Sequence, residues 1–222
     1  LFFGKVVIAV AFDCVEQMIY WTDITQPSIS RATLQGGETS VLISSDLGSP
    51  EGISIDHVSR NMYWTDSVLD RLEVSRLDGS QRRVLFDDDL INPRPIVADP
   101  AHGYLYWADW NRDGPKIERS GLDGSDRTVL VQDGLGLPNA LTFDPQSRRL
   151  CWADAGQTKL TEGIQYPFAI VSYGRNLYYT DWRRFDSQTR LSRTSVEEFL
   201  PQKRSRIYGI AITYPQCPAG LS

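Results

Sequence analysis

Aspartate is the residue whose spacing most invites a chemical reading in this 222-residue chain, because carboxylates in register could hold a cation or act in acid–base chemistry. Five copies each follow a pair of aromatic residues, or Cys-Trp, and one small residue; they are Asp23, Asp66, Asp109, Asp154 and Asp181. Successive copies lie 43, 43, 45 and 27 residues apart. A period of this length is typical of repeated supersecondary units, which would spread the carboxylates around the fold. We therefore expect them to bind neighbouring backbone groups rather than one metal ion.

One period, residues 52–86, contains four short alternating runs separated by turn residues. Such runs predict strands, and four strands in about 43 residues are typical of a β-propeller blade. A helical solenoid is excluded because apolar residues do not recur at helical spacing between caps. Six copies of the first strand can be recognised, with apolar starts at Val10, Ile53, Ile96, Leu141, Ile170 and Ile210. The sequence predicts an all-β fold, a single six-bladed propeller domain over residues 1–222.

The sixth copy of the first strand reaches the C-terminus, and no second strand follows it. We therefore expect residues 1–3 to supply a strand that completes this blade, which would remove the open sheet edge. This closure would bring Cys14 beside Cys217, where a disulfide could pin the ring. Such a disulfide implies an oxidising, extracellular setting. The alternative is three unpaired buried thiols, with Cys151 as the third.

The chain is short for its repeat, since six blades of this period need roughly 260 residues. The step between Asp154 and Asp181 lacks room for a third and fourth strand. We therefore predict that segments of the natural chain are missing near 3/4 and 160/161, with 184/185 as a third candidate.

Composition argues against several functions. The net charge is −5 and no basic stripe exists, so nucleic acid is a poor partner. The longest apolar run, residues 6–12, is too short to span a bilayer, and no signal peptide opens the chain, so we expect a domain of a longer protein without membrane insertion. The cysteines lack metal-ligand spacing, and His57 and His102 lack a catalytic motif around them, so no metal, cofactor or enzymatic activity is predicted.

The most informative position is one that varies while the framework repeats. Two residues before the apolar start of each first strand stand Ile8, Glu51, Arg94, Asn139, Phe168 and Tyr208. If first strands line the axis, these side chains ring one mouth of a central channel. Second strands return to that face, so Trp110 and Trp182 lie beside the ring, while His57 and His102 lie on the opposite face. Aromatic and arginine side chains with a few polar groups are typical of protein-binding sites. Alternatively, Phe168 and Tyr208 plug the channel, a role that is compatible with partner binding.

The Tyr-Trp-Thr-Asp motifs at 20–23 and 63–66 resemble the propellers of the low-density lipoprotein receptor group. Residues 49–53, 107–113, 136–144, 150–156 and 166–168 are more specifically similar to the nidogen (entactin) family, with its second paralogue the nearer one. The resemblance covers nearly the whole chain outside the suspected gaps. It implies a secreted basement-membrane protein whose propeller is a non-enzymatic adhesion module and binds an EGF-like (LE) module of the laminin γ chain through the mouth.

The resemblance also implies residue roles. Arg94 would pair with a laminin carboxylate, while Glu51 and Asn139 would hydrogen-bond the entering loop. Phe168, Tyr208 and Trp110 would enclose it, and Ile8 and Trp182 complete the expected site. Pro95 departs from the small residue usual after the arginine and removes a backbone donor. Replacing Arg94 or Phe168 with alanine is expected to abolish laminin binding with little change in melting temperature.

Other partners and functions stay open at this point. Type IV collagen and perlecan are further partners that the resemblance implies for the full-length protein. The main alternative is the ligand-binding propeller of a lipoprotein-receptor-related cell-surface receptor. A lactonase-like or glycosidase-like propeller enzyme would need clustered carboxylates or metal ligands in the channel, which the ring residues do not supply.

Overall fold

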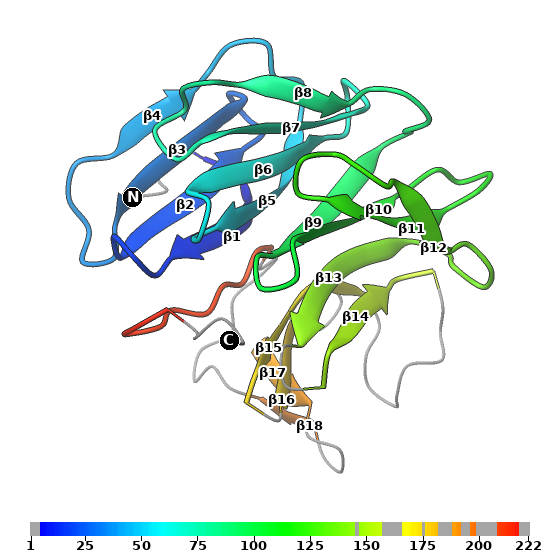
Figure 1. The fold of residues 1–222 in the computed structure, drawn as a ribbon. Helices are drawn as coiled ribbons and strands as arrows, with labels where there is room; N and C mark the ends of the chain where they lie inside the picture. The colour runs from blue at the N-terminus through cyan, green and yellow to red at the C-terminus, as the bar shows by residue number, and fades with distance from the viewer. Residues whose placement is uncertain are drawn as a thin grey trace.

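The computed structural model describes residues 5–144, 147–156, 166–174, 176–181, 188–191, 196–198 and 208–217. In these ranges the regular elements are all strands, and they form five antiparallel sheets that follow one another around a centre (Figure 1). No helix in the described ranges is long and apolar enough to cross a membrane. The predicted all-β propeller is confirmed.

Four of the sheets hold four strands in chain order, as the repeat predicts. The first contains β1 (Val7–Asp13), β2 (Met18–Asp23), β3 (Ser28–Thr33) and β4 (Ser40–Ile43). The second contains β5 (Pro50–Asp56), β6 (Asn61–Asp66), β7 (Arg71–Arg76) and β8 (Arg83–Phe86). The third contains β9 (Pro93–Asp99), β10 (Tyr104–Asp109), β11 (Lys116–Gly121) and β12 (Thr128–Val131). The fifth contains β15 (Pro167–Tyr173), β16 (Asn176–Asp181), β17 (Gln188–Leu191) and β18 (Val196–Glu198).

The fourth sheet pairs β13 (Pro138–Asp144) with β14 (Arg149–Asp154), and the described residues add no further strand to it. The expected gap at 160/161 falls among residues that are not described, as do those at 3/4 and 184/185. The strand expected from residues 1–3 likewise lies outside the described residues.

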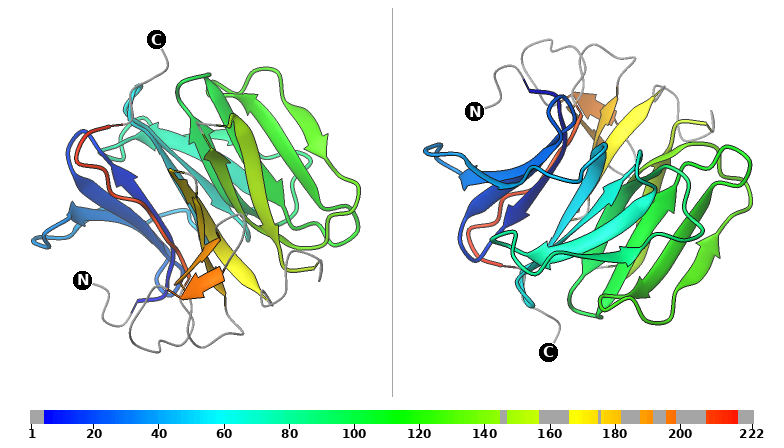
Figure 2. Two further views of the ribbon diagram at one scale, coloured as in Figure 1. Left: turned by 90° about the horizontal axis from the view of Figure 1, so that it is seen from below. Right: turned by 90° about the horizontal axis from the view of Figure 1, so that it is seen from above.

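The first strand of each sheet packs beside the first strand of the next, which arranges the sheets in a ring (Figure 1). Residues 208–214 take the sixth place in this ring, and both views of Figure 2 show this segment running beside β1. On one side the Thr180 hydroxyl donates to the Tyr208 carbonyl oxygen at 2.9 Å. On the other side the Gln17 side-chain amide donates to the Tyr214 carbonyl oxygen at 3.0 Å. The ring therefore closes through this C-terminal segment.

A disulfide joins Cys14 to Cys217, with 4.9 Å between the two Cα atoms, as predicted from the closure. It links the end of β1 to the end of the closing segment across a sequence separation of 203 residues. Cys151 on β14 has no disulfide partner in the described part of the chain and is half-buried.

The core lies between the blades. Trp21, Trp64 and Trp107 are fully buried in the first three sheets. One apolar cluster combines Tyr20 and Ile29 of the first blade with Trp64 of the second. Large aromatic rings bury much apolar area, so each interface between blades is held mainly by such a ring and its aliphatic neighbours. The tryptophan that precedes the repeated aspartate by two residues thus packs between blades, as Trp64 does in the first cluster.

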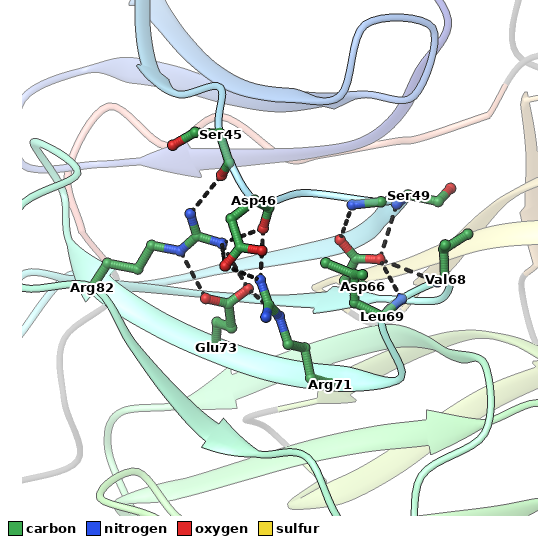
Figure 3. Close-up of polar contacts among 10 residues, drawn as sticks. Ser45, Asp46, Ser49, Asp66, Val68, Leu69, Arg71, Glu73 and Arg82 are labelled. Atoms are coloured by element: carbon green, nitrogen blue, oxygen red, sulfur yellow. Dashed lines mark hydrogen bonds and ion pairs between the residues drawn. The ribbon is translucent and has the colours of Figure 1, made fainter.

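The repeated aspartate ties each blade to the chain that enters it. Asp66 accepts hydrogen bonds from the backbone amides of Gly48 at 2.7 Å and Ser49 at 2.9 Å, which precede β5. It also accepts from the amides of Val68 and Leu69, which follow β6 (Figure 3). The other copies also accept backbone amide hydrogen bonds; they are Asp23, Asp109, Asp154 and Asp181. These contacts confirm the expected structural role.

A buried glutamate fixes the loop between the first two blades. Glu73 on β7 accepts from the Nε atoms of Arg71 at 2.9 Å and Arg82 at 2.7 Å. Both arginines also donate to the carbonyl oxygen of Asp46, in the loop before β5 (Figure 3). Because the buried carboxylate is paired and hydrogen-bonded on both sides, the network holds this loop in one place.

The next blade repeats the device. Glu118 on β11 accepts from Arg127 at 2.9 Å, and Lys116 Nζ lies 3.4 Å from its carboxylate. Lys116 and Arg127 both donate to the carbonyl oxygen of Asp89, in the loop before β9. Two of the loops that lead to the ring residues are therefore anchored in the same way.

Candidate functional site

A register slip in each blade places the ring residues. In the second blade Pro50 pairs with Asp66 but Gly52 pairs with Thr65, so Glu51 has no residue opposite it. One extra residue in one strand is a β-bulge, which bends the strand and re-aims a side chain. Glu51 consequently lines the channel instead of following the alternation of β5.

The slip recurs at the same place in the other described sheets. Asn139 in β13 and Phe168 in β15 are extra residues in the same sense. In β1 and β9 the pairing shifts by one across residues 7–10 and 93–96. Five blades thus carry equivalent irregularities where the first strand begins, and this is what directs non-identical side chains to one end of the ring.

The first strands surround a channel of about 390 Å³. We call the end lined by Ile8, Glu51, Asn139 and Phe168 the mouth. The end lined by Cys14, His57, His102 and Tyr214 is called the base. Each first strand runs seven residues from one end to the other, so the two ends are separate surfaces. The structure thus places the two histidines on the face opposite the ring.

Arg94 is held on three sides at the mouth. It forms an ion pair with Glu51, and its Nε donates to the Asn92 side-chain oxygen at 2.6 Å. Its guanidinium carbon lies 3.9 Å from the centroid of the Trp110 ring, close enough for a cation–π contact. Burial lowers the pKa of Arg94, and the charge of Glu51 opposes that shift.

Glu51 is held as firmly. Its Oε1 accepts from the Ser67 hydroxyl at 2.8 Å and the Ser49 hydroxyl at 3.3 Å. The ion pair with Arg94 therefore has few alternative geometries, and both ionic groups are fixed before any partner arrives.

The contacts continue around the mouth. Trp110 Nε1 donates to the Pro138 carbonyl oxygen at 3.1 Å, and the Asn139 amide donates to the Pro167 carbonyl oxygen at 2.7 Å. The rings of Phe168 and Tyr208 meet edge to face, with centroids 5.2 Å apart.

Asn139 also presents an acceptor. The residue is buried, and its Oδ1 atom has no hydrogen-bond partner among the described residues. Buried polar atoms are usually paired, so this oxygen is suited to a donor from a ligand that enters the mouth.

The expected site residues that the structure describes thus gather at one end of the ring. Ile8 is a buried apolar member of the mouth, and Trp182 lies outside the described residues. Sequence reasoning missed Asn92, which positions Arg94. Ser67 follows Asp66 as Trp110 follows Asp109, and it lies beside the ring as expected and positions Glu51. Asn92 has a φ of 65°, a conformation that asparagine tolerates, and an asparagine before a proline was the available signal for such a turn.

The departure at Pro95 is compensated locally. In the first blade the Ala9 amide donates to the Thr22 hydroxyl at 3.1 Å. At the equivalent positions of the third blade stand Pro95, which has no amide hydrogen, and Ala108, which has no hydroxyl. Donor and acceptor are absent together, so the proline leaves no unpaired group at this point of the ladder.

The base holds a compact group of possible metal ligands, formed by Cys14, His57 and Cys217. Both sulfur atoms belong to the disulfide, so they are not available as thiolate ligands. His102 is held within its own turn, with Nδ1 2.7 Å from an Asp99 carboxylate oxygen.

Asp109 gives the site a pH-dependent anchor. Burial raises the pKa of Asp109 to about 6. The Ile91 amide, which donates to the carboxylate at 2.8 Å, lowers the pKa but does not offset the effect of burial. The folded protein therefore binds this proton more tightly than the unfolded chain. The free energy of unfolding should then fall as pH rises from about 4 to about 6, by up to about 3 kcal/mol from this group.

Urea denaturation between pH 4 and pH 7 checks this prediction. Asp109→Asn removes the titrating group, so the variant should lose this part of the pH dependence. Equal slopes for the two proteins over that range would show that Asp109 keeps an ordinary affinity for its proton.

Comparison with known proteins identifies the family. The family model described as low-density lipoprotein receptor repeat class B matches residues 17–57, 60–100 and 103–145, more than half of the chain. The chain is 67% identical to mouse (Mus musculus) nidogen-1 over 233 residues, covering 98% of this chain and 19% of that protein. It superposes with a TM-score of 0.91 on a chain in the crystal structure of a nidogen/laminin complex. That match has 54% sequence identity and covers 96% of this chain and 87% of the other. The chain belongs to the nidogen branch of this repeat family.

The chain is less similar to nidogen-2 than to nidogen-1, contrary to our expectation. Identity to mouse nidogen-2 is 51% over 234 residues, covering 98% of this chain and 17% of that protein. The higher identity to nidogen-1 means that the expected nearness to the second paralogue was wrong. This nidogen-type chain spans under a fifth of the length of both relatives.

A gluconolactonase from Xanthomonas campestris is a more distant neighbour, with a TM-score of 0.75 and 14% identity. That match covers 90% of this chain and 78% of the other. Identity this low shows a shared fold alone.

Proposed function

We propose that this propeller is a non-enzymatic adhesion module of the extracellular matrix and binds an EGF-like module of a laminin γ chain at its mouth. The observation that carries the proposal is the close structural match to the chain from a nidogen/laminin complex. The proposed contact residues are Arg94, Glu51, Asn139, Phe168, Tyr208, Trp110 and Ile8, with Trp182 as a further member.

The geometry supports a rigid receptor for a polar loop. Side chains at the mouth hold one another, so little conformational freedom remains to be lost on binding. Arg94 uses Nε for Asn92 and Nη1 for Glu51, and its Nη2 has no hydrogen bond to a described residue. That edge of the guanidinium can take a carboxylate from the loop, and the Asn139 oxygen can take an N–H donor.

Binding measurements with isolated modules test the proposal. Each EGF-like module of a laminin γ short arm is passed over the immobilised chain, with the modules of the α and β chains as matched controls. We expect one γ-chain module to bind, at one copy per propeller. The proposal fails if every γ-chain module binds no better than the α- and β-chain controls.

We further propose that the protein is secreted and resides in basement membrane, and that its full-length form also binds type IV collagen and perlecan. Membership of the nidogen branch supports this location, and the disulfide is compatible with an oxidising compartment.

We also propose that residues 1–222 form a single domain from which segments near 3/4, 160/161 and 184/185 are missing. The alignment with mouse nidogen-1 extends over 233 residues, more than this chain contains, which supports missing segments.

A further inference from the structure

An exposed apolar group lies on the mouth side of the second and third blades. Val68 and Leu69 form the turn after β6 and are 66% and 38% exposed, and Ile91 in the loop before β9 is 53% exposed. Single exposed apolar side chains are common and need no explanation. Three in adjoining loops beside a proposed binding site form a local apolar cluster, which is typical of an interaction surface.

The other blades serve as internal controls for the turn. After β2, in the first blade, the positions equivalent to Val68 and Leu69 hold Thr25 and Gln26, both exposed. The fold therefore accepts polar residues in this turn, where the Thr25 amide donates to Asp23 as the Val68 amide donates to Asp66. The apolar pair in the second blade is not required by the turn itself.

The loop position of Ile91 can be aligned by its hydrogen bond. Its amide donates to Asp109, as the Gly48 amide donates to Asp66 and the Gly136 amide donates to Asp154. Two equivalent positions thus hold glycine, which projects no side chain. An isoleucine that stays half in solvent at this position adds apolar surface without adding to the core.

These three residues adjoin the mouth. The Asn92 amide donates to the Asp70 side chain at 2.7 Å, which joins the loop of Ile91 to the turn of Val68 and Leu69. Asn92 also accepts from Arg94. A continuous path therefore leads from the ion pair at the mouth to the exposed apolar side chains.

We infer that Val68, Leu69 and Ile91 form an outer patch that binds an aliphatic or aromatic side chain of the same laminin module, outside the loop that enters the mouth. This inference rests on the proposed function. A specific protein interface usually buries about 800 Å² on each partner, so a module seated at the mouth must also cover neighbouring ground. The patch is uncharged and apolar, and the chemistry that complements it is an apolar side chain.

The test is the variant Val68→Thr/Leu69→Gln/Ile91→Ser, which takes its first two residues from the first blade and keeps the net charge. We expect the binding γ-chain module to bind roughly 10–100-fold more weakly, mainly through faster dissociation, with the melting temperature little changed. Val41→Thr/Val84→Thr is the matched control. Both valines are exposed on the outer strands β4 and β8, away from the mouth, and their replacement should not change affinity.

The outcomes separate this inference from the proposed function. Wild-type affinity in the triple variant, with binding lost in Arg94→Ala, overturns the patch and leaves the mouth site standing. If no γ-chain module binds the wild-type chain, the proposed function fails and the patch falls with it. If the triple variant folds poorly, the single variant Ile91→Ser is measured in its place. An unchanged affinity of Ile91→Ser for the module would also overturn the patch.

Discussion

Replacing Arg94 with alanine is expected to weaken laminin binding by roughly 30-fold to several-thousand-fold. The guanidinium is partly buried at the mouth and offers a fixed edge to an incoming carboxylate. Removing one partner of a desolvated charge pair costs about 2–5 kcal/mol, which gives this range of affinity. Surface plasmon resonance with the binding γ-chain module measures it, and most of the loss should appear in the dissociation rate.

The ion pair with Glu51 changes the expected effect on stability. Sequence alone predicts a nearly unchanged melting temperature for Arg94→Ala. In the structure the variant would leave the Glu51 carboxylate without its cation in a largely buried position, so some loss of stability is now expected. A variant that keeps its affinity while losing stability would show that Arg94 serves the fold and not the partner.

Arg60 provides a matched control for this effect. Its side chain is 30% exposed, against 25% for Arg94, and it also pairs with a buried carboxylate, that of Asp13. It lies in the turn after β5, at the base end of the ring. Arg60→Ala should therefore cost comparable stability while leaving laminin binding intact.

Removing the disulfide is expected to give the largest loss of stability. The variant Cys14→Ser/Cys217→Ser should lose about 2–5 kcal/mol of unfolding free energy, because the bridge closes a loop of about 200 residues. For a chain of this size that corresponds to roughly 4–20 °C in melting temperature. Urea denaturation with and without a reductant measures it.

Cys151→Ser is the control for the disulfide experiment. It removes the third thiol, which has no disulfide partner in the described part of the chain, and leaves the ring closure in place. Equal denaturation midpoints for the wild type and the double serine variant would mean that contacts such as Gln17 to Tyr214 close the ring without the bridge.

The repeat is visible in the sequence, and it predicts the ring of blades. Asp66 and Trp64 recur at fixed spacing because each blade needs the same backbone tie and the same ring between blades. The disulfide followed from the same logic, since closing a ring brings its two ends together. These features depend on periodicity, which a sequence displays directly.

The site itself was less predictable in its contacts. Which side chains face the mouth depends on β-bulges, and a bulge is a register between two strands that alternation in one strand does not reveal. The repeat predicts that Glu51 and Arg94 both line the ring, yet their mutual ion pair depends on how closely neighbouring blades approach there. Asn92 was missed because it acts through Arg94 from a loop that precedes the strand.

The most direct test of the central claim is hydroxyl-radical footprinting of the propeller with and without the binding γ-chain module. Both ends of the channel carry aromatic side chains, so each experiment contains its own control. Trp110, Phe168 and Tyr208 at the mouth should become protected, while Tyr173 and Tyr214 at the base react as before. Protection of the two base tyrosines with an unchanged mouth would contradict the account.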